Sequence, residues 1–179
     1  MNDSSKLSRM ALESGAIRLS PEKPFTWASG YKMPIYNDNR LLLGKAEYRS
    51  FIAQIFAKYS EASVDNVDVI AGTATAGIPH ATTLADRLSK PLIYVRATTK
   101  SHGMGNQIEG PLVPGQKVLL IEDLISTGGS AINAVNAIRE VGGIVENCFC
   151  IFSYGFIEAR QRFDEINCQY QSILTFPDL

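Results

Sequence analysis

The architecture of this chain can be predicted from one segment, Val118-Leu119-Leu120-Ile121-Glu122-Asp123-Leu124-Ile125-Ser126-Thr127-Gly128-Gly129-Ser130-Ala131. Its four consecutive apolar residues, Val118 to Ile121, predict a strand that is buried on both faces, as in a parallel sheet. Two adjacent acids follow, where such a strand would emerge from the core. A polar turn comes next, and an amphipathic run from Ala131 to Val141 predicts a helix.

The polar turn Ser126-Thr127-Gly128-Gly129-Ser130 is suited to bind an anion. Its glycines allow close approach of the backbone, and the hydroxyls and amides at a helix start favour a phosphate. A hydroxyl residue before a helix is also common as a simple cap, so the turn alone leaves both interpretations open. The carboxylates of Glu122 and Asp123 favour a ligand, because they repel each other unless a cation or a sugar uses them. Together these groups match a ribose 5-phosphate.

Bulk properties limit the class of protein. A chain of 179 residues is most simply one domain, and its 45% apolar and 20% charged residues are ordinary for a globular protein. The formal net charge of -1 argues against a general nucleic-acid binder. We expect no membrane span, no signal peptide and a cytoplasmic location. Of the three cysteines, Cys148 and Cys150 fall on one face of a predicted strand and read as buried thiols.

The order of predicted elements indicates an α/β protein. From residue 67 onward, strands alternate with helices, which predicts a mostly parallel central sheet flanked by helices and joined by right-handed crossovers. Helices are predicted at 4–14, 45–59, from 78, 131–141 and 157–166, and strands at 16–19, 67–71, 92–96, 118–121, 144–152 and 172–176.

A second candidate anion loop follows the strand at 67–71. It consists of small residues and two threonines, Thr73, Ala74, Thr75, Ala76 and Gly77, placed directly before a helix. Such loops are often only tight turns. Two of them at the carboxyl ends of parallel strands, however, fit a sugar that carries phosphate at one end and pyrophosphate at the other. We interpret His80, in the first turn of that helix, as a packing or capping residue.

Residues 25–40, Phe-Thr-Trp-Ala-Ser-Gly-Tyr-Lys-Met-Pro-Ile-Tyr-Asn-Asp-Asn-Arg, combine aromatic and hydrogen-bonding side chains. One interpretation is an antiparallel edge hairpin whose aromatic rings pack on the core. The other is a cap over a flat polar ring, in which aromatic residues stack and Lys32 and Arg40 pair with an anionic base.

A long glycine-containing connection runs from residue 97 to 114, and such connections in compact domains are usually functional or disordered. Arg96, Lys100 and His102 place cationic or proton-carrying groups at its start. They are either solvated loop charges or partners of the pyrophosphate.

These motifs carry a family resemblance. The segment from Glu122 to Ser130 resembles the ribose-phosphate signature of type I phosphoribosyltransferases, and residues 25–40 and 94–110 resemble the hood and the catalytic loop of the orotate phosphoribosyltransferases. The resemblance implies a single domain over 1–179 with the type I fold, a small N-terminal hood at about 1–43 and a mobile catalytic loop at about 97–114.

The resemblance also implies the roles of individual residues. Catalysis would use Lys100, His102 and Arg96, and the pyrophosphate loop would be Thr73 to Gly77. The substrate phosphoribosyl pyrophosphate would be held at Glu122, Asp123, Leu124, Ile125, Ser126, Thr127, Gly128, Gly129 and Ser130, and orotate at Ser126, Lys32, Tyr36 and Arg40. Both acids would stay ionised.

The implied cofactor is Mg²⁺ without a direct protein ligand, and the implied assembly is a homodimer whose loop acts in trans. Many family members have lysines where Ala28 and Ala97 or Thr98 stand here. The predicted product is orotidine 5'-monophosphate. The alternatives are transfer to another base, and a regulator that binds phosphoribosyl pyrophosphate without chemistry.

Overall fold

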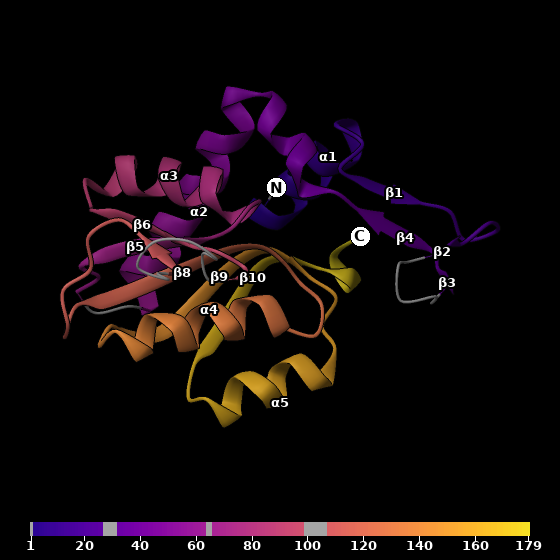
Figure 1. Ribbon diagram of the computed structural model, residues 1–179. Helices are drawn as coiled ribbons and strands as arrows, with labels where there is room; N and C mark the ends of the chain where they lie inside the picture. Colours follow the sequence, from indigo (N-terminus) through magenta and orange to yellow (C-terminus); the bar gives the residue numbers. More distant parts are fainter. Residues whose placement is uncertain (1, 27–31, 64–65, 99–106) are drawn as a thin grey trace.

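The computed structural model describes residues 2–26, 32–63, 66–98 and 107–179. Its centre is a six-stranded sheet in the order β10-β9-β8-β5-β6-β7 (Figure 1). All neighbours pair in parallel except β6 and β7, which are antiparallel. The sheet therefore confirms the predicted mostly parallel α/β architecture. The strands are β5 (Val69–Thr73), β6 (Leu92–Val95), β7 (Ile108–Glu109), β8 (Lys117–Ile125), β9 (Ile144–Ser153) and β10 (Gln169–Thr175).

Helices cover both faces of the sheet. On one face lie α1 (Asp3–Glu13), α2 (Ala46–Ser63) and α3 (Gly77–Leu88), and on the other lie α4 (Gly129–Glu140) and α5 (Ile157–Glu165) (Figure 1). Two hydrophobic clusters result, one on each face. Successive residues of β8 alternate between them, since Leu119 packs in the first cluster and Leu120 in the second. The prediction that residues 118–121 are buried on both faces is confirmed.

The N-terminal strands form two small antiparallel pairs outside the main sheet. β1 (Ile17–Leu19) pairs with β4 (Ile35–Asn37), and β2 (Phe25–Thr26) pairs with β3 (Lys32–Met33). These hood strands extend to one side of the body in Figure 1. A short 3-10 helix, η1 (Asn39–Gly44), leads back to α2, and a second one, η2 (Phe176–Asp178), follows β10.

Several element boundaries differ from the sequence-based prediction, and three of the differences bear on the site. β8 does not end before the acids but continues to Ile125, because β9 stays paired with it as far as Ile125↔Ser153. α4 starts at Gly129 rather than at Ala131. The predicted loop at 97–114 contains the short strand β7, which pairs with the end of β6.

The buried thiols are confirmed. Cys148, Cys150 and Cys168 are free and buried, and burial raises the pKa of the first two thiols well above the ordinary value. His80 is 2% exposed, as expected of a packing residue. Among the described residues, no helix is both long and apolar enough to cross a membrane.

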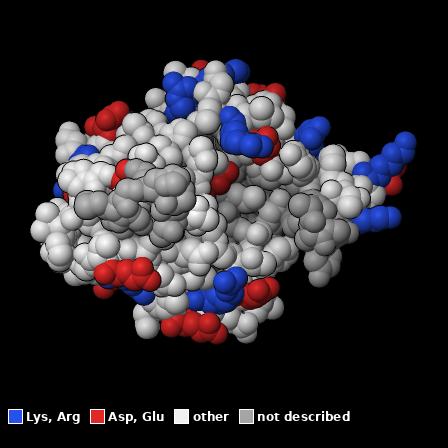
Figure 2. Space-filling model, in the orientation of Figure 1, with Lys and Arg blue, Asp and Glu red and all other residues white. Residues whose placement is uncertain are grey.

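Charged side chains of both signs are interspersed over the face drawn in Figure 2. On that face, the described residues form no continuous basic area.

Candidate active site

The two predicted anion loops meet at the carboxyl edge of the sheet. β5 and β8 are parallel neighbours with Gly72 opposite Ile121, so the loops that follow them emerge side by side. Thr73 ends β5 and donates a hydrogen bond from Oγ1 to the Ile121 carbonyl oxygen at 3.2 Å. Gly77 packs into the same junction: a Cβ there would lie 2.5 Å from Thr73 Oγ1 and 2.6 Å from the Ile121 oxygen. Only glycine lets α3 start this close to β8.

Both helices at this edge begin without a side-chain cap. α3 follows Ala76, and α4 follows Gly128, which has a positive φ of 81°. Neither residue has a side chain that accepts a hydrogen bond from the first helical turn. The first-turn amides of α4 are therefore available to an anion. At α3 Gly77 offers its amide, whereas the Ile78 N–H donates to the Thr75 carbonyl oxygen at 3.4 Å and Pro79 has no N–H. The helix dipoles favour negative charge at both starts.

Glu122 lies between the loops. It is 5% exposed, and its two carboxyl oxygens accept hydrogen bonds from the Asp123 backbone N–H at 2.9 Å and from Ser130 Oγ at 3.2 Å. Burial, followed by the neighbouring Asp123, raises the pKa of Glu122 to about 8. Burial therefore opposes, at Glu122, the ionised state that the resemblance implies for both acids. Asp123 is only half-buried.

Arg96 follows β6 at the same edge. Its backbone N–H donates to the Gln107 carbonyl oxygen at 2.9 Å, and Gln107 Nε2 donates to the Arg96 carbonyl oxygen at 2.8 Å. Arg96 Nη1 lies 3.9 Å from Glu109 Oε1. The structure thus places Arg96 beside the β5 loop, in a cavity of about 230 Å³. The cavity is lined by Thr73, Ala74, Val95, Arg96, Ala97, Gln107, Ser130, Asn133 and Ala134. Lys100 and His102 lie outside the described residues.

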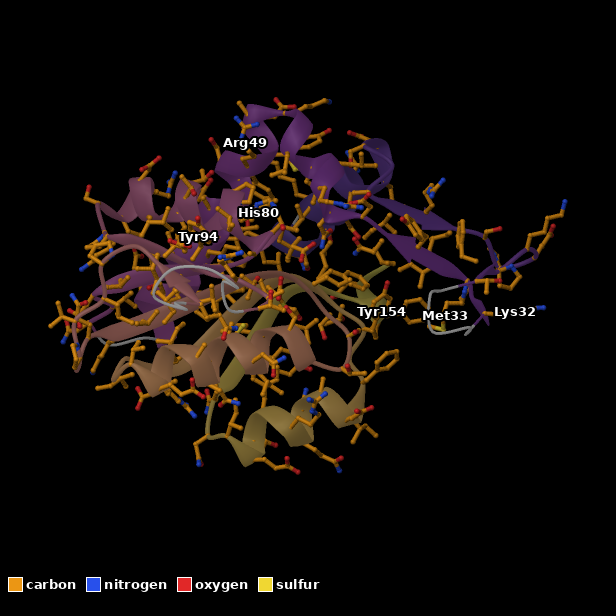
Figure 3. All side chains as sticks on the ribbon, viewed as in Figure 1. Lys32, Met33, Arg49, His80, Tyr94 and Tyr154 are labelled. Atoms are coloured by element: carbon orange, nitrogen blue, oxygen red, sulfur yellow. The ribbon has the colours of Figure 1, made fainter. Side chains whose placement is uncertain are left out.

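Of the predicted base-binding residues, Lys32, Tyr36 and Arg40 are spread over the hood, whereas Ser126 lies in the turn between β8 and α4. Arg40 donates from Nε and Nη2 to both carboxyl oxygens of Asp38, at 2.6 and 2.9 Å, and thereby lowers the pKa of Asp38. The Arg18 guanidinium lies over the Tyr36 ring, with Cζ 4.8 Å from the ring centroid. Lys32 is exposed at the outer end of the hood and its side chain points away from the body (Figure 3). The described residues therefore bring together the sugar-phosphate groups more closely than the base-binding groups.

Sequence reasoning missed three residues at this edge. Asn39 is buried and reaches Asp123 from the hood, Arg162 reaches the turn at residues 126–130 from α5, and Asn133 lines the cavity. Asn39 stood inside a segment already singled out, but no pattern indicated its partner. Arg162 and Asn133 sit on ordinary amphipathic helices and carry no sequence signal.

Comparisons with known proteins agree with this geometry. The model of the phosphoribosyl transferase domain family matches residues 42–170. An orotate phosphoribosyltransferase of Listeria innocua is 48% identical over 179 residues, which are 100% of this chain and 86% of the relative.

Two solved structures have a similar fold. The orotate phosphoribosyltransferase from Aeropyrum pernix matches with a TM-score of 0.84 at 29% identity, over 96% of this chain and 94% of that one. The UMP synthase of Leishmania donovani matches with a TM-score of 0.81 at 25% identity, over 98% of this chain, which spans only 37% of that longer protein. The resemblance inferred from the motifs is confirmed. The chain belongs to the phosphoribosyl transferase domain family and, within it, to the orotate phosphoribosyltransferases.

Proposed function

We propose that the chain transfers the 5-phosphoribosyl group from phosphoribosyl pyrophosphate to orotate, giving orotidine 5'-monophosphate and pyrophosphate. The observation that supports this most strongly is the pair of uncapped helix starts at one sheet edge, with Glu122 and Asp123 between them. A pentose with an anionic group at each end matches two anion sites separated by groups that bind hydroxyls.

This placement supports the sugar-phosphate roles that we propose. The turn at residues 126–130 holds the 5-phosphate through backbone amides and hydroxyls, and the loop at residues 73–77 contributes amides to the pyrophosphate. Glu122 and Asp123 hold the ribose hydroxyls. Departure of pyrophosphate from the anomeric carbon gives the transition state oxocarbenium character, so a carboxylate near the ring stabilises it.

The departing pyrophosphate gains negative charge and needs cations beside it. Arg96 supplies one, from the end of β6 next to the cavity described above. Lys100 and His102 are assigned to the same task, with Lys100 as the principal catalytic residue. Orotate is assigned to Ser126, Lys32, Tyr36 and Arg40. The hydrogen bond and charge of Asp38 chiefly raise the pKa of the Arg40 guanidinium, and the carboxylate of Asp123 adds a small effect in the same direction.

Magnesium is the proposed cofactor. Among the described residues, no three histidine, cysteine or acidic side chains gather into a metal site. Glu122 and Asp123 would hold the ribose, and Mg²⁺, a hard cation that keeps several of its waters, would need few direct protein ligands there. The ribose held by Glu122 and Asp123 would carry such an ion, which when bound would neutralise charge on the pyrophosphate.

The proposed assembly is a homodimer in the cytoplasm, with the catalytic loop of one subunit serving the other. This proposal rests on the family to which the chain belongs. Light scattering of the purified chain tests it: twice the chain mass of 19.6 kDa is the expected result, and the chain mass itself contradicts the dimer.

The function is tested by incubating the protein with magnesium and phosphoribosyl pyrophosphate, and with orotate, uracil or adenine in separate reactions. The expected result is consumption of orotate alone, with release of pyrophosphate. Consumption of adenine or uracil instead would assign a different base. Tight binding of phosphoribosyl pyrophosphate without turnover of any base would indicate a regulator.

A further inference from the structure

Arg162 of α5 lies directly against the turn at residues 126–130, here called the phosphate turn. Its Nη1 donates a hydrogen bond to the Thr127 carbonyl oxygen at 3.0 Å. A Cβ built on Gly129 would lie 3.8 Å from Nη1 and 3.9 Å from Nη2 of the same guanidinium. The cation therefore borders both the middle of the turn and the first residue of α4.

Packing holds α5 against this turn. A Cβ on Gly128 would lie 2.9 Å from a ring carbon of Phe163, the residue after Arg162. Phe163 is 1% exposed, and its ring centroid lies 4.8 Å from that of Tyr170 on β10. Since Phe163 is fixed in the core, the last turn of α5 forms a rigid support for the phosphate turn. Arg162 is positioned by this support as well as by its hydrogen bond.

The hydrogen bond has a geometric consequence. In a trans peptide the carbonyl oxygen and the next N–H point in opposite directions. Because the Thr127 oxygen is directed to Arg162, the Gly128 N–H is directed away from α5. A guanidinium this close also adds positive charge to the field of the α4 N-terminus.

We propose that Arg162 is a positioning residue for the 5-phosphate of the substrate. It acts through the phosphate turn: it fixes the direction of the turn's amides and raises the positive potential at the anion site. The inference rests on the proposed function, which assigns the 5-phosphate to this turn. It assigns no role in pyrophosphate or base binding to Arg162.

Three variants of Arg162 separate charge from hydrogen bonding, and a fourth variant is the control. R162A removes both, R162Q keeps a donor without the charge, and R162K keeps the charge without the planar guanidinium. Arg160 lies on the same helix and is exposed, so R160A makes the same change in net charge away from the turn. Calorimetry measures the affinity of each protein for ribose 5-phosphate and for inorganic pyrophosphate, which probe the two anion sites separately.

R162A should weaken ribose 5-phosphate binding about tenfold, the cost of one charge-assisted contact, and leave pyrophosphate binding within about twofold. The KM for phosphoribosyl pyrophosphate should rise with it, while the KM for orotate stays unchanged. R162K should recover part of the affinity. Its affinity should fall more steeply with added salt than that of R162A, because lysine keeps the charge. R162Q should lie between R162A and the unmodified protein, because it keeps a donor for the Thr127 oxygen but not the charge. R160A should resemble the unmodified protein.

Unchanged affinity of R162A for ribose 5-phosphate would overturn the inference. Equal loss of affinity for ribose 5-phosphate and for pyrophosphate would overturn it too, because it indicates general loosening of the fold. If R162A does not fold, R162K serves as the test. It should bind ribose 5-phosphate about threefold more weakly than the unmodified protein. Unchanged binding would overturn the inference. If the unmodified protein binds neither ribose 5-phosphate nor phosphoribosyl pyrophosphate, the proposed function fails, and the inference with it.

Discussion

Asn39 donates a hydrogen bond from Nδ2 to the backbone carbonyl oxygen of Asp123 at 2.7 Å. Asn39 begins η1 after the hood strand β4, and Asp123 lies near the end of β8, so this bond joins the hood to the edge of the sheet that carries the proposed sugar site. The side chain is 2% exposed, and its Oδ1 has no hydrogen-bond partner among the described residues. The position of the Asp123 backbone therefore depends on a residue of the hood.

Replacing Asn39 with alanine should lower the free energy of unfolding by about 1–3 kcal/mol, because the Asp123 oxygen loses a buried donor. The KM for phosphoribosyl pyrophosphate should rise as well, since Asp123 is no longer held. Urea unfolding and steady-state kinetics measure the two effects. Asn136→Ala, on the exposed side of α4, is the matched control and should change stability by less than about 0.5 kcal/mol. An Asn39→Ala protein as stable as the control would contradict the assigned role.

Gly77→Ala should destabilise the protein by about 1–3 kcal/mol, because the new Cβ meets Thr73 Oγ1 and the Ile121 oxygen within 2.6 Å. Relief of that clash moves α3 away from β8 and separates the two anion loops, so turnover should fall too. Thermal unfolding and the orotate assay measure both. Gly44→Ala is the control, since a Cβ there meets no atom within 4 Å. Equal stability of the two variants would show that the junction is not tight.

His80 should make the protein less stable in acid. Burial lowers the pKa of His80 from 6.5 to about 4, and the nearby Arg49 acts in the same direction; Figure 3 shows the two residues on neighbouring helices. Between these pH values the unfolded chain binds the proton and the folded one does not. Stability therefore falls as the pH drops from 6.5 to about 4, by up to about 3 kcal/mol.

Glu122 has the opposite effect on the pH dependence of stability. Its pKa is raised in the folded state, so its contribution to folding stability is lost as the pH rises from 4.5 to about 8. The measurement is therefore the difference in unfolding free energy between the unmodified protein and His80→Gln across this range. The difference should shift in favour of the variant as the pH falls. A constant difference would mean that His80 is protonated equally in both states.

Lys100→Ala should lower kcat by about 100-fold or more while changing the KM for phosphoribosyl pyrophosphate only a few-fold, as expected for a cation that acts mainly on the departing group. Lys90, exposed after α3, gives the control variant Lys90→Ala, which should keep full activity. Unchanged turnover in Lys100→Ala would remove this residue from the mechanism.

Local patterns allowed prediction of the sheet and of the two loops at its edge. The apolar run at residues 118–121 and the small residues at 73–77 carry their own signals, since burial and tight approach to a neighbour are recorded in residue type. The burial of Glu122 was missed because it depends on how far β9 accompanies β8, and pairing length is a property of two strands. Asn39 and Arg162 were missed for a similar reason: each reaches its partner across the fold.

The reciprocal hydrogen bonds between Arg96 and Gln107 have a consequence for variation of this protein. They join the residue after β6 to the residue before β7. The distance between the two ends of the intervening segment is therefore fixed by these bonds and by the pairing of β6 with β7. A stretch inserted between such fixed anchors can be exchanged for one of another length or composition while the sheet keeps its register. If Lys100 and His102 act in the transfer as proposed, the chemistry of transfer and the folding of the body can thus diversify independently.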